Sequence, residues 1–279
     1  MVKPDEFAGV WPAHLLMIGC GNMAGAMLAR WLECGLPPSR VTVIRPSGKP
    51  VADGVRVQTG LSEAVPSGTL VLLGCKPQQL TEVSRDLAGQ VGEGTTLISI
   101  LAGVPVARLR AVFGERVAIV RCMPNLPVRF GRGVSALYTD AETPEHVRAL
   151  ASDMCASLGL VEWLDDEGLF DAATALSGCG PAFLYRFVDA LGAAGAKLGL
   201  DPAQAMRMAL ATVEGAAMSV ATGTSSPAAM ADAVASKGGM TRQGLDVLDR
   251  PDGLAALLAQ TLRAAQLRGA ELAALAAEA

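Results

Sequence analysis

The fold of this chain is decided by the stretch His14-Leu15-Leu16-Met17-Ile18-Gly19-Cys20-Gly21-Asn22-Met23-Ala24-Gly25. An apolar run enters a G-x-G pair, and the small residue Ala24 follows three positions later, before an Ala- and Leu-rich helical pattern. This order of strand, glycine-rich turn and helix is typical of a βαβ unit that binds a dinucleotide. We expect Gly19 to make the tight turn, Gly21 to admit a pyrophosphate and Ala24 to let the helix pack closely. The alternative is an ordinary tight turn, because such glycines also occur without a cofactor.

The end of the second predicted strand, Val41 to Ile44, indicates which dinucleotide is bound. Many NAD enzymes carry a carboxylate at this point for the ribose 2′-hydroxyl. This chain instead has Arg45, Ser47 and Lys49. A guanidinium, a hydroxyl and an ammonium group suit a 2′-phosphate, so the sequence favours NADPH, with NADH possible. The alternative is a solvated loop with ordinary surface cations.

Length and composition limit the class of protein. The 279 residues fit one large or two modest domains. A net charge of −4 and scattered arginines argue against a nucleic-acid surface, and we expect no membrane partner because no run of about 20 residues lacks charges or helix breakers. The six cysteines form no C-x-x-C pair, so we predict free thiols, no metal site and a cytoplasmic location.

The composition changes along the chain. Short β-branched runs alternate with helical stretches as far as Asp166, which predicts an α/β domain with a mostly parallel sheet and helices on both faces. From Glu167 onward the strand signals vanish, and Ala, Leu, Met and Gly dominate. The predicted layout is an N-terminal Rossmann-type dinucleotide-binding domain, residues 1–166, followed by an all-α domain for dimerisation and substrate binding, residues 167–279.

The stretch from Gly180 to Leu200 is apolar on nearly every side, which in a protein of this composition predicts a buried helix. An all-α domain of this size offers little cover for such a helix. We therefore expect a homodimer or a larger homo-oligomer that forms through the C-terminal helices. The alternative is a helix that threads the core of a single chain.

Three further segments carry polar groups at predicted strand or helix ends. Lys76, in Cys75-Lys76-Pro77-Gln78, follows the fourth strand and is placed to touch a cofactor, or to begin a helix in solvent. Asn125 follows the sixth strand between two prolines, where its amide would hold either a nicotinamide carboxamide or the loop itself. The turn from Ser236 to Gly244 leaves backbone N–H groups open at the start of a helix, an arrangement suited to a carboxylate.

The two histidines are badly placed for catalysis, and this favours one kind of substrate. His14 lies inside the first predicted strand and His146 on a charged amphipathic helix. A dehydrogenase that deprotonates an alcohol therefore lacks its usual base. Reduction of a protonated imine needs no strong base, and a hydroxyl that hydrogen-bonds the imine nitrogen suffices.

The chain resembles the pyrroline-5-carboxylate reductase family over nearly its whole length. The motifs that carry the resemblance are Ile18–Ala24, Cys75–Gln78, Ser99–Val104, Arg121–Asn125, Ala175–Ala182 and Ser236–Thr241. Members of this family reduce 1-pyrroline-5-carboxylate to L-proline, the last step of proline biosynthesis, by hydride transfer from NAD(P)H. The resemblance implies a cyclic imino acid as substrate and a helical domain interleaved in a dimer, often within larger rings.

The resemblance also assigns roles to residues. The cofactor residues that we expect are Gly19, Gly21, Asn22, Met23, Arg45, Ser47, Lys49, Lys76, Pro77, Ala102 and Asn125. The substrate residues that we expect are Ser236, Gly238, Gly239, Met240 and Thr241, with Thr241 as the catalytic hydroxyl near the ring nitrogen.

The chain departs from the family pattern at Leu126, Cys179, Lys237 and Met240, where the family commonly has threonine, serine, proline and a smaller residue or threonine. These departures leave open a relative that reduces another cyclic imine. A β-hydroxyacid dehydrogenase of the same layout is a further alternative, but it requires a lysine soon after Gly178, and the first is Lys197. A dinucleotide sensor without catalytic activity is the remaining alternative.

Overall fold

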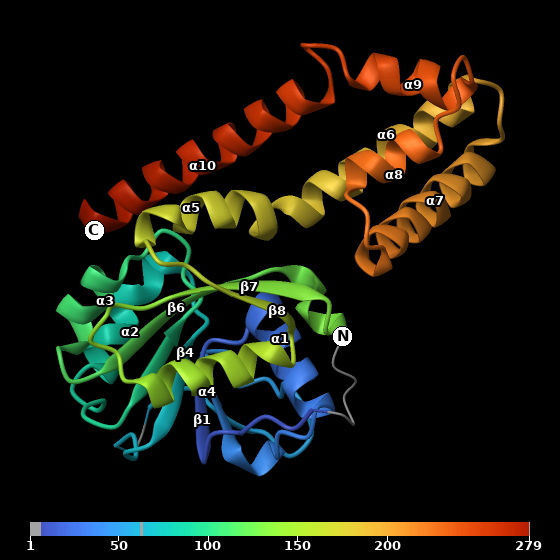
Figure 1. Cartoon of the computed structure of the whole chain (residues 1–279). Coiled ribbons are helices and arrows are strands. Elements are labelled where there is room, and N and C mark those ends of the chain that lie inside the picture. The colour runs from blue at the N-terminus through green and yellow to red at the C-terminus, as the bar shows by residue number, and fades with distance from the viewer. Residues whose placement is uncertain (1–6, 62–63, 279) are drawn as a thin grey trace. The chain divides into compact units, whose positions relative to one another are not determined.

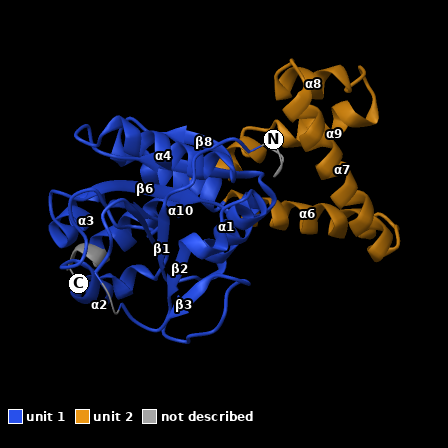
Figure 2. Ribbon diagram, turned by 90° about the horizontal axis from the view of Figure 1, so that it is seen from below, with its two compact units in different colours: residues 1–179, 265–279 blue, residues 180–264 orange. Residues whose placement is uncertain are grey.

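The computed structural model describes residues 7–61 and 64–278, with side chains as far as Ala274. The chain forms two compact units, which Figure 2 distinguishes by colour. Unit 1 comprises residues 1–179 and 265–279, and unit 2 comprises residues 180–264. The division after Cys179 differs from the domain boundary at residues 166 and 167, which stays a prediction.

Unit 1 is built on a sheet of strands in the spatial order β3-β2-β1-β4-β5-β6-β7-β8 (Figure 1). The strands are β1 (His14–Ile18), β2 (Val41–Ile44), β3 (Arg56–Gln58), β4 (Thr69–Leu73), β5 (Thr96–Ser99), β6 (Ala118–Pro124), β7 (Gly133–Tyr138) and β8 (Gly159–Trp163). Every neighbouring pair is parallel except β6 and β7. The predicted α/β class and mostly parallel sheet are confirmed. The count of the strand before Lys76 as the fourth implies a third strand, and the structure places it at β3, whose polar Arg56 and Gln58 hide it in the sequence.

Alternate residues of β1 point into two separate hydrophobic clusters, as the period of a strand requires. Leu15 and Met17 belong to a cluster with residues of α1 (Asn22–Glu33) and α4 (Glu145–Ala156). Leu16 and Ile18 belong to a second cluster with residues of α2 (Leu80–Leu87) and α3 (Val106–Phe113). Two helices therefore cover each face of the sheet, as the sequence predicts.

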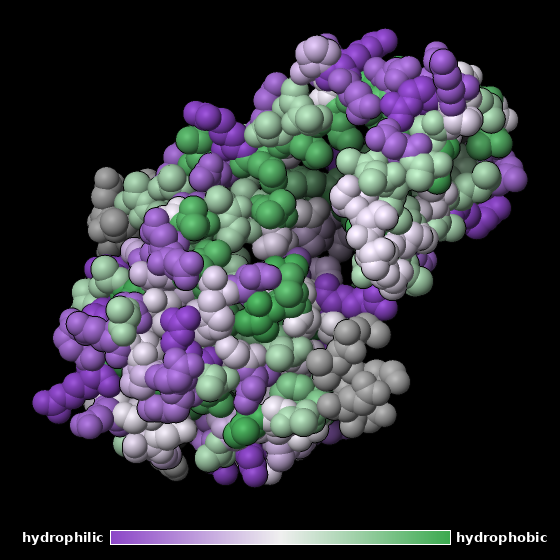
Figure 3. Space-filling model, viewed as in Figure 1, coloured by the Kyte–Doolittle hydropathy of each residue, from purple (hydrophilic) through white to green (hydrophobic). Residues whose placement is uncertain are grey.

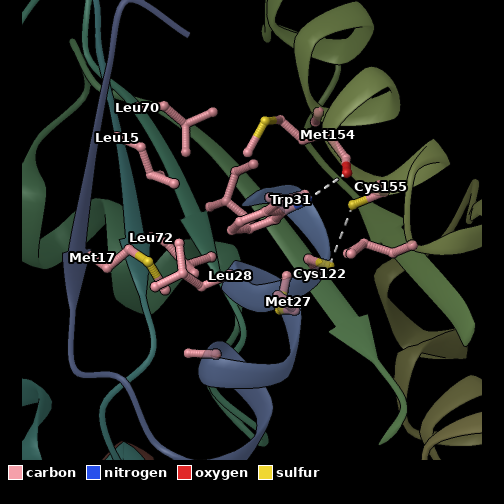
Figure 4. Close-up of a cluster of buried hydrophobic side chains, with 14 of the residues drawn as sticks. Leu15, Met17, Met27, Leu28, Trp31, Leu70, Leu72, Cys122, Met154 and Cys155 are labelled. Atoms are coloured by element: carbon pink, nitrogen blue, oxygen red, sulfur yellow. Dashed lines mark hydrogen bonds between the residues drawn. The ribbon is translucent and has the colours of Figure 1, made fainter. Parts of the chain in front are cut away.

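Helices α1 and α4, which cover one face of the sheet, are joined to each other by hydrogen bonds as well as by apolar contacts. The indole Nε1 of Trp31 donates to the carbonyl of Met154 at 2.8 Å, which Figure 4 shows among the surrounding leucines and methionines. The guanidinium Nε of Arg30 donates to the carbonyl of Ser157 at 3.0 Å. Because these donors satisfy carbonyls at the end of α4, the two helices can pack without buried unpaired groups there.

Helix α1 packs unusually closely on the sheet. A Cβ atom built on Gly74, directly after β4, would lie 2.8 Å from the Cβ of Ala24 in α1. Ala24 is only 1% exposed, so its methyl group has no room to move away from a Cβ at position 74. The two small residues together allow the start of α1 to approach the ends of β1 and β4.

A connecting segment leads from β8 toward unit 2. It consists of η5 (Glu167–Leu169), α5 (Phe170–Ala173) and the π-helical turn η6 (Thr174–Gly178). Phe170 is buried with Met123 and Ala136 in a small third cluster. Shorter 3-10 turns occur at η2 (Pro38–Arg40), η3 (Pro77–Gln79) and η4 (Leu126–Phe130).

Unit 2 is helical, as predicted for this part of the chain. It contains α6 (Gly180–Lys197), α7 (Pro202–Thr222), α8 (Pro227–Ala233), α9 (Met240–Leu248) and the first part of α10 (Leu254–Glu278). Helices α6 and α7 meet where Gly192 faces Met206, whose Cα would lie 3.2 Å from a Cβ on that glycine. The expected cap of α7 is confirmed, since the Asp201 carboxylate accepts from the Gln204 N–H at 2.9 Å.

Helix α6 is not buried within one chain, so the alternative of a helix that threads a single-chain core is wrong. Gly192 is its one buried residue, and the large side chains of Leu184, Tyr185 and Phe187 are 46 to 60% exposed. Apolar side chains, drawn in green, interrupt the hydrophilic surface of unit 2 in Figure 3. Cover from a second copy of the chain stays a prediction, and this exposure supports it.

The close approach of α1 predicts opposite effects for two glycine substitutions. We expect Gly74→Ala to lower the free energy of unfolding by about 1–3 kcal/mol, because it overpacks a site with no free space. Gly25→Ala, in the neighbouring residue of α1, would place its Cβ 3.7 Å from Cys20 Sγ, an ordinary contact. We expect it to raise stability by about 0.4–1 kcal/mol. Urea unfolding curves measure both, and equal effects would contradict the close-packing argument.

Candidate dinucleotide and imine site

A cavity of about 550 Å³ opens at the carboxyl ends of β1, β2 and β4. This edge of a parallel sheet is where dinucleotide-binding folds hold their ligand. The predicted cofactor residues that line it are Gly19, Gly21, Arg45, Ser47 and Lys76. The structure therefore brings together residues that lie far apart in the sequence.

The turn at Gly19 requires glycine. Its φ is +84°, and a Cβ built on it would lie 2.8 Å from the Gly74 carbonyl oxygen. Its N–H donates to the carbonyl of Ile44 at 2.8 Å, and the Gly74 N–H donates to the carbonyl of Ile18 at 2.8 Å. These bonds hold the three strand ends together beneath the cavity.

The start of α1 is open toward the cavity. Gly21 is the N-cap residue, no side chain caps the helix, and a Cβ on Gly21 would meet nothing within 4 Å. Asn22 and Met23 form the first helical turn. Open N–H groups and the helix dipole make this end suited to a phosphate.

The cavity contains charges of both signs. Arg45 and Lys76 enter it from the loops after β2 and β4, and Glu82 and Asp86 face it from α2. The loop of Lys76 is braced by Gln79, whose Oε1 accepts from the Lys76 N–H at 3.0 Å. Arg45 and Ser47 line the cavity beside the end of β2, and their contact with a 2′-phosphate stays a prediction. The acidic residues were missed, because a surface helix commonly carries carboxylates and nothing in the pattern shows which ones face a cavity.

Two cysteines also line the cavity and are held in the neutral form. Burial raises the pKa of the Cys75 thiol to about 11. Burial raises the pKa of the Cys20 thiol as well, and the nearby charge of Arg45 opposes that shift. At neutral pH neither thiol adds a negative charge to a site that is to receive phosphates.

The remaining predicted cofactor residues lie outside the lining of this cavity. Lys49 is exposed, and its backbone N–H donates to Ser47 Oγ at 3.4 Å. Pro77 begins η3, directly after Lys76. Ala102 is exposed in the loop after β5. Contact of these residues with a cofactor stays a prediction.

Asn125 holds its own loop, one of the two alternatives that the sequence left open. Its Oδ1 accepts from the N–H of Val134 at 2.8 Å, and its Nδ2 donates to the carbonyl of Ser177 at 2.9 Å. The side chain is buried, with 6% of the residue exposed. A direct contact with the nicotinamide stays a prediction.

His14 is accounted for by the fold. Its ring nitrogens lie 3.0 Å from the Thr42 hydroxyl and 3.4 Å from the Thr69 hydroxyl, on the strands that flank β1. Burial lowers its pKa, which keeps the ring neutral at neutral pH. His146 lies on α4, as predicted.

In unit 2 the predicted substrate residues form a tight turn that opens α9. The Gly239 N–H donates to the Ser236 carbonyl at 2.9 Å, and Gly238 has a φ of +72°. A Cβ on Gly239 would lie 3.1 Å from the Ser236 carbonyl oxygen, so a larger residue fits there only tightly. Gly239 is the N-cap and no side chain caps the helix, which leaves the N-terminal turn with Met240 and Thr241 exposed. The expected helix start is confirmed.

Comparison with known proteins identifies the family. Residues 167–272 match the family model described as pyrroline-5-carboxylate reductase dimerisation, and residues 14–103 match one described as NADP oxidoreductase coenzyme F420-dependent. The pyrroline-5-carboxylate reductase of Pseudomonas aeruginosa is 34% identical over 93% of this chain and 97% of its own length. The chain belongs to the pyrroline-5-carboxylate reductase family. The enzyme of that name from a Synechocystis strain is 36% identical over 93% of this chain and 98% of its own length.

Solved structures of pyrroline-5-carboxylate reductases share the fold. The structure from Coxiella burnetii has a TM-score of 0.83 and 28% identity, and it covers 94% of this chain and 99% of its own. The Plasmodium falciparum structure, solved with NADP bound, also has a TM-score of 0.83, with 24% identity over 94% of this chain and 98% of its own. The predicted order of a Rossmann-type part and a helical part is confirmed, and the dimerisation model places self-association in the helical part.

Over the described ranges 7–61 and 64–278, no helix is long and apolar enough to cross a membrane. Within the same ranges no group of three or more His, Cys, Asp or Glu side chains could hold a metal ion.

Proposed function

We propose that this chain reduces 1-pyrroline-5-carboxylate to L-proline with NADPH, the final step of proline biosynthesis. The observation that carries the proposal is the pairing of a dinucleotide cavity with a glycine-rich turn in a helical part that matches the family's dimerisation model. A turn rich in open N–H groups suits a carboxylated ring, and the cavity suits a phosphorylated dinucleotide.

The chain's own residues bind the two ends of the cofactor. The open start of α1, with Gly21, Asn22 and Met23, receives the pyrophosphate. Arg45 and Ser47 receive the 2′-phosphate through charge-assisted hydrogen bonds. Lys76 adds a positive charge at the same edge of the sheet.

The turn from Ser236 to Thr241 binds the substrate. Its backbone N–H groups, with the positive end of the α9 dipole, hold the ring carboxylate. The Thr241 hydroxyl oxygen accepts a hydrogen bond from the N–H of the protonated imine and orients the ring. NADPH supplies the hydride that adds to the imine carbon. Because the protonated imine is already electrophilic, the residues contribute positioning and exclusion of water, and no histidine base is required.

Two residues that we expect near the substrate support one alternative substrate. Met240 is 94% exposed and stands within the substrate turn, and Leu126 is 51% exposed after β6. Both are bulkier than the residues that the family pattern leads us to expect at these positions. A different cyclic imine is therefore the second candidate substrate.

The proposal is tested by following NADPH oxidation with 1-pyrroline-5-carboxylate, with 1-piperideine-carboxylates and NADH as comparisons. Rapid oxidation with the five-membered ring supports proline synthesis. Tight NADPH binding with turnover of the six-membered ring alone favours the second candidate. NADPH binding without turnover of any imine would contradict an enzymatic role and favour a sensor.

Arg45 should decide the preference between the two dinucleotides. We expect Arg45→Ala to weaken NADPH binding by about 10- to 100-fold, the effect of losing a hydrogen bond to a charged group, and to leave NADH binding nearly unchanged. Lys49→Ala is the comparison, because Lys49 lies outside the cavity lining, and its effect should be smaller. Titration of each variant with both dinucleotides measures this. An equal loss for NADPH and NADH would place Arg45 elsewhere than at the 2′-phosphate.

Thr241 should act through its hydroxyl. We expect Thr241→Ala to lower kcat by roughly 10- to 1,000-fold, the scale for one lost positioned hydrogen bond, with NADPH affinity unchanged. Thr241→Ser keeps the hydroxyl and should retain most of the activity. Steady-state kinetics with saturating NADPH distinguish the two variants. An unchanged rate in Thr241→Ala would remove this residue from the mechanism.

We propose a homodimer or a larger assembly of dimers in the cytoplasm. The exposed apolar side chains of α6 and the match of residues 167–272 support self-association. The composition and spacing of the cysteines support a reducing compartment.

A further inference from the structure

The segment that leads out of unit 1 into α6 packs against β7 and is hydrogen-bonded to one short motif, Arg121 to Asn125 at the end of β6. At the near end of the segment, Arg121 Nη1 donates to Glu167 Oε1 at 2.8 Å. The same guanidinium lies 3.8 Å from the ring centroid of Phe170. Glu167 Oε1 also accepts from the N–H of Val106 at 2.8 Å, which ties the segment to the start of α3.

At the far end, the segment is held by Asn125. The orientation of its amide follows from its partners, because a backbone N–H can only donate and a carbonyl can only accept. Oδ1 therefore faces the Val134 N–H at 2.8 Å, and Nδ2 faces the Ser177 carbonyl at 2.9 Å. Both partners are main-chain groups, so this one side chain links β6, the start of β7 and the connecting segment.

The carbonyl that Asn125 binds lies in an irregular turn. The Cys179 N–H donates to the carbonyl of Thr174 at 2.9 Å, a bond that spans five residues instead of four. Such a π-type turn widens the helix. The Ser177 carbonyl has no regular helical partner, because the residue four positions on, Pro181, lacks an N–H. The adjacent Gly178 packs toward Met123, whose Cγ would lie 3.7 Å from a Cβ on that glycine. Two residues after Ser177 the chain enters unit 2.

We propose that Asn125 is a positioning residue that locks the π-turn at Thr174 to Gly178, from which the helical unit begins. This inference rests on the proposed function, since hydride transfer requires the cofactor and the imine to meet in a fixed geometry. A misplacement of about 1 Å can lower such a rate by about 100-fold. A side chain that touches neither reactant then controls turnover.

The test uses the two asparagines of the chain, Asn22 and Asn125, each changed to aspartate. Asn125→Asp keeps an acceptor for the Val134 N–H but replaces the donor to the Ser177 carbonyl with a negative oxygen. We expect kcat to fall at least about 10-fold, with the Kd for NADPH changed less than about twofold. Asn22→Asp puts the same charge at the start of α1, beside the proposed pyrophosphate site. It should raise the Kd for NADPH and leave the π-turn intact.

Hydrogen exchange of the Cys179 amide, measured by NMR in the cofactor-free protein, reports the turn directly. We expect faster exchange in Asn125→Asp and an unchanged rate in Asn22→Asp. Asn125→Ser, which introduces no charge, should show the same fall in kcat and the same faster exchange of the Cys179 amide. It replaces Asn125→Asp in the test if the aspartate variant fails to fold.

Two results would overturn the proposal. A raised Kd for NADPH in the Asn125 variants, with Cys179 exchange unchanged, would mean that Asn125 contacts the nicotinamide instead. A lowered Tm with kcat, Kd and Cys179 exchange all unchanged would reduce Asn125 to a structural residue. If the unmodified protein turns over no cyclic imine, the proposed function fails, yet the exchange measurement still decides whether Asn125 locks the turn.

Discussion

The structure of unit 1 depends on the close contact between the start of α1 and the ends of β1 and β4. Gly19, Ala24 and Gly74 leave no space for larger side chains, and backbone hydrogen bonds join the three strand ends beneath them. This contact brings the open first turn of α1 to the edge of the sheet where the loops after β2 and β4 converge. The cavity, its positive charges and its neutral thiols all follow from that approach.

The helical part of the chain depends on a different constraint. Its helices carry apolar side chains around most of their circumference, and one chain cannot bury them all. Family membership, with a matched dimerisation model, explains why such helices are retained. The same helical part carries the exposed turn at Ser236 to Thr241, where we propose that the substrate binds.

The motif from Arg121 to Asn125 in unit 1 has a role that its residue types do not reveal. Arginine and asparagine at the end of a strand are typical ligand contacts, and the sequence leaves open whether Asn125 holds a nicotinamide or its own loop. In the structure, their partners are Glu167, Phe170, Val134 and Ser177, all within unit 1. Nothing local distinguishes the two roles, because the partners of Asn125 lie 9 and 52 residues away in the sequence.

The sequence by itself determined the strands and helices, the glycine-rich turn at Gly19, the helix starts at Pro202 and Met240, and the family. These features depend on short-range patterns, namely apolar periodicity, glycine at turns and caps at helix ends. Only the tertiary structure decided that edge strand β3 joins the sheet, that Glu82 and Asp86 face the cavity, that Lys49 does not, and that Asn125 braces a π-turn. The physical reason is that side-chain orientation and long-range hydrogen-bond partners are set by packing between elements, which residue spacing along the chain does not encode.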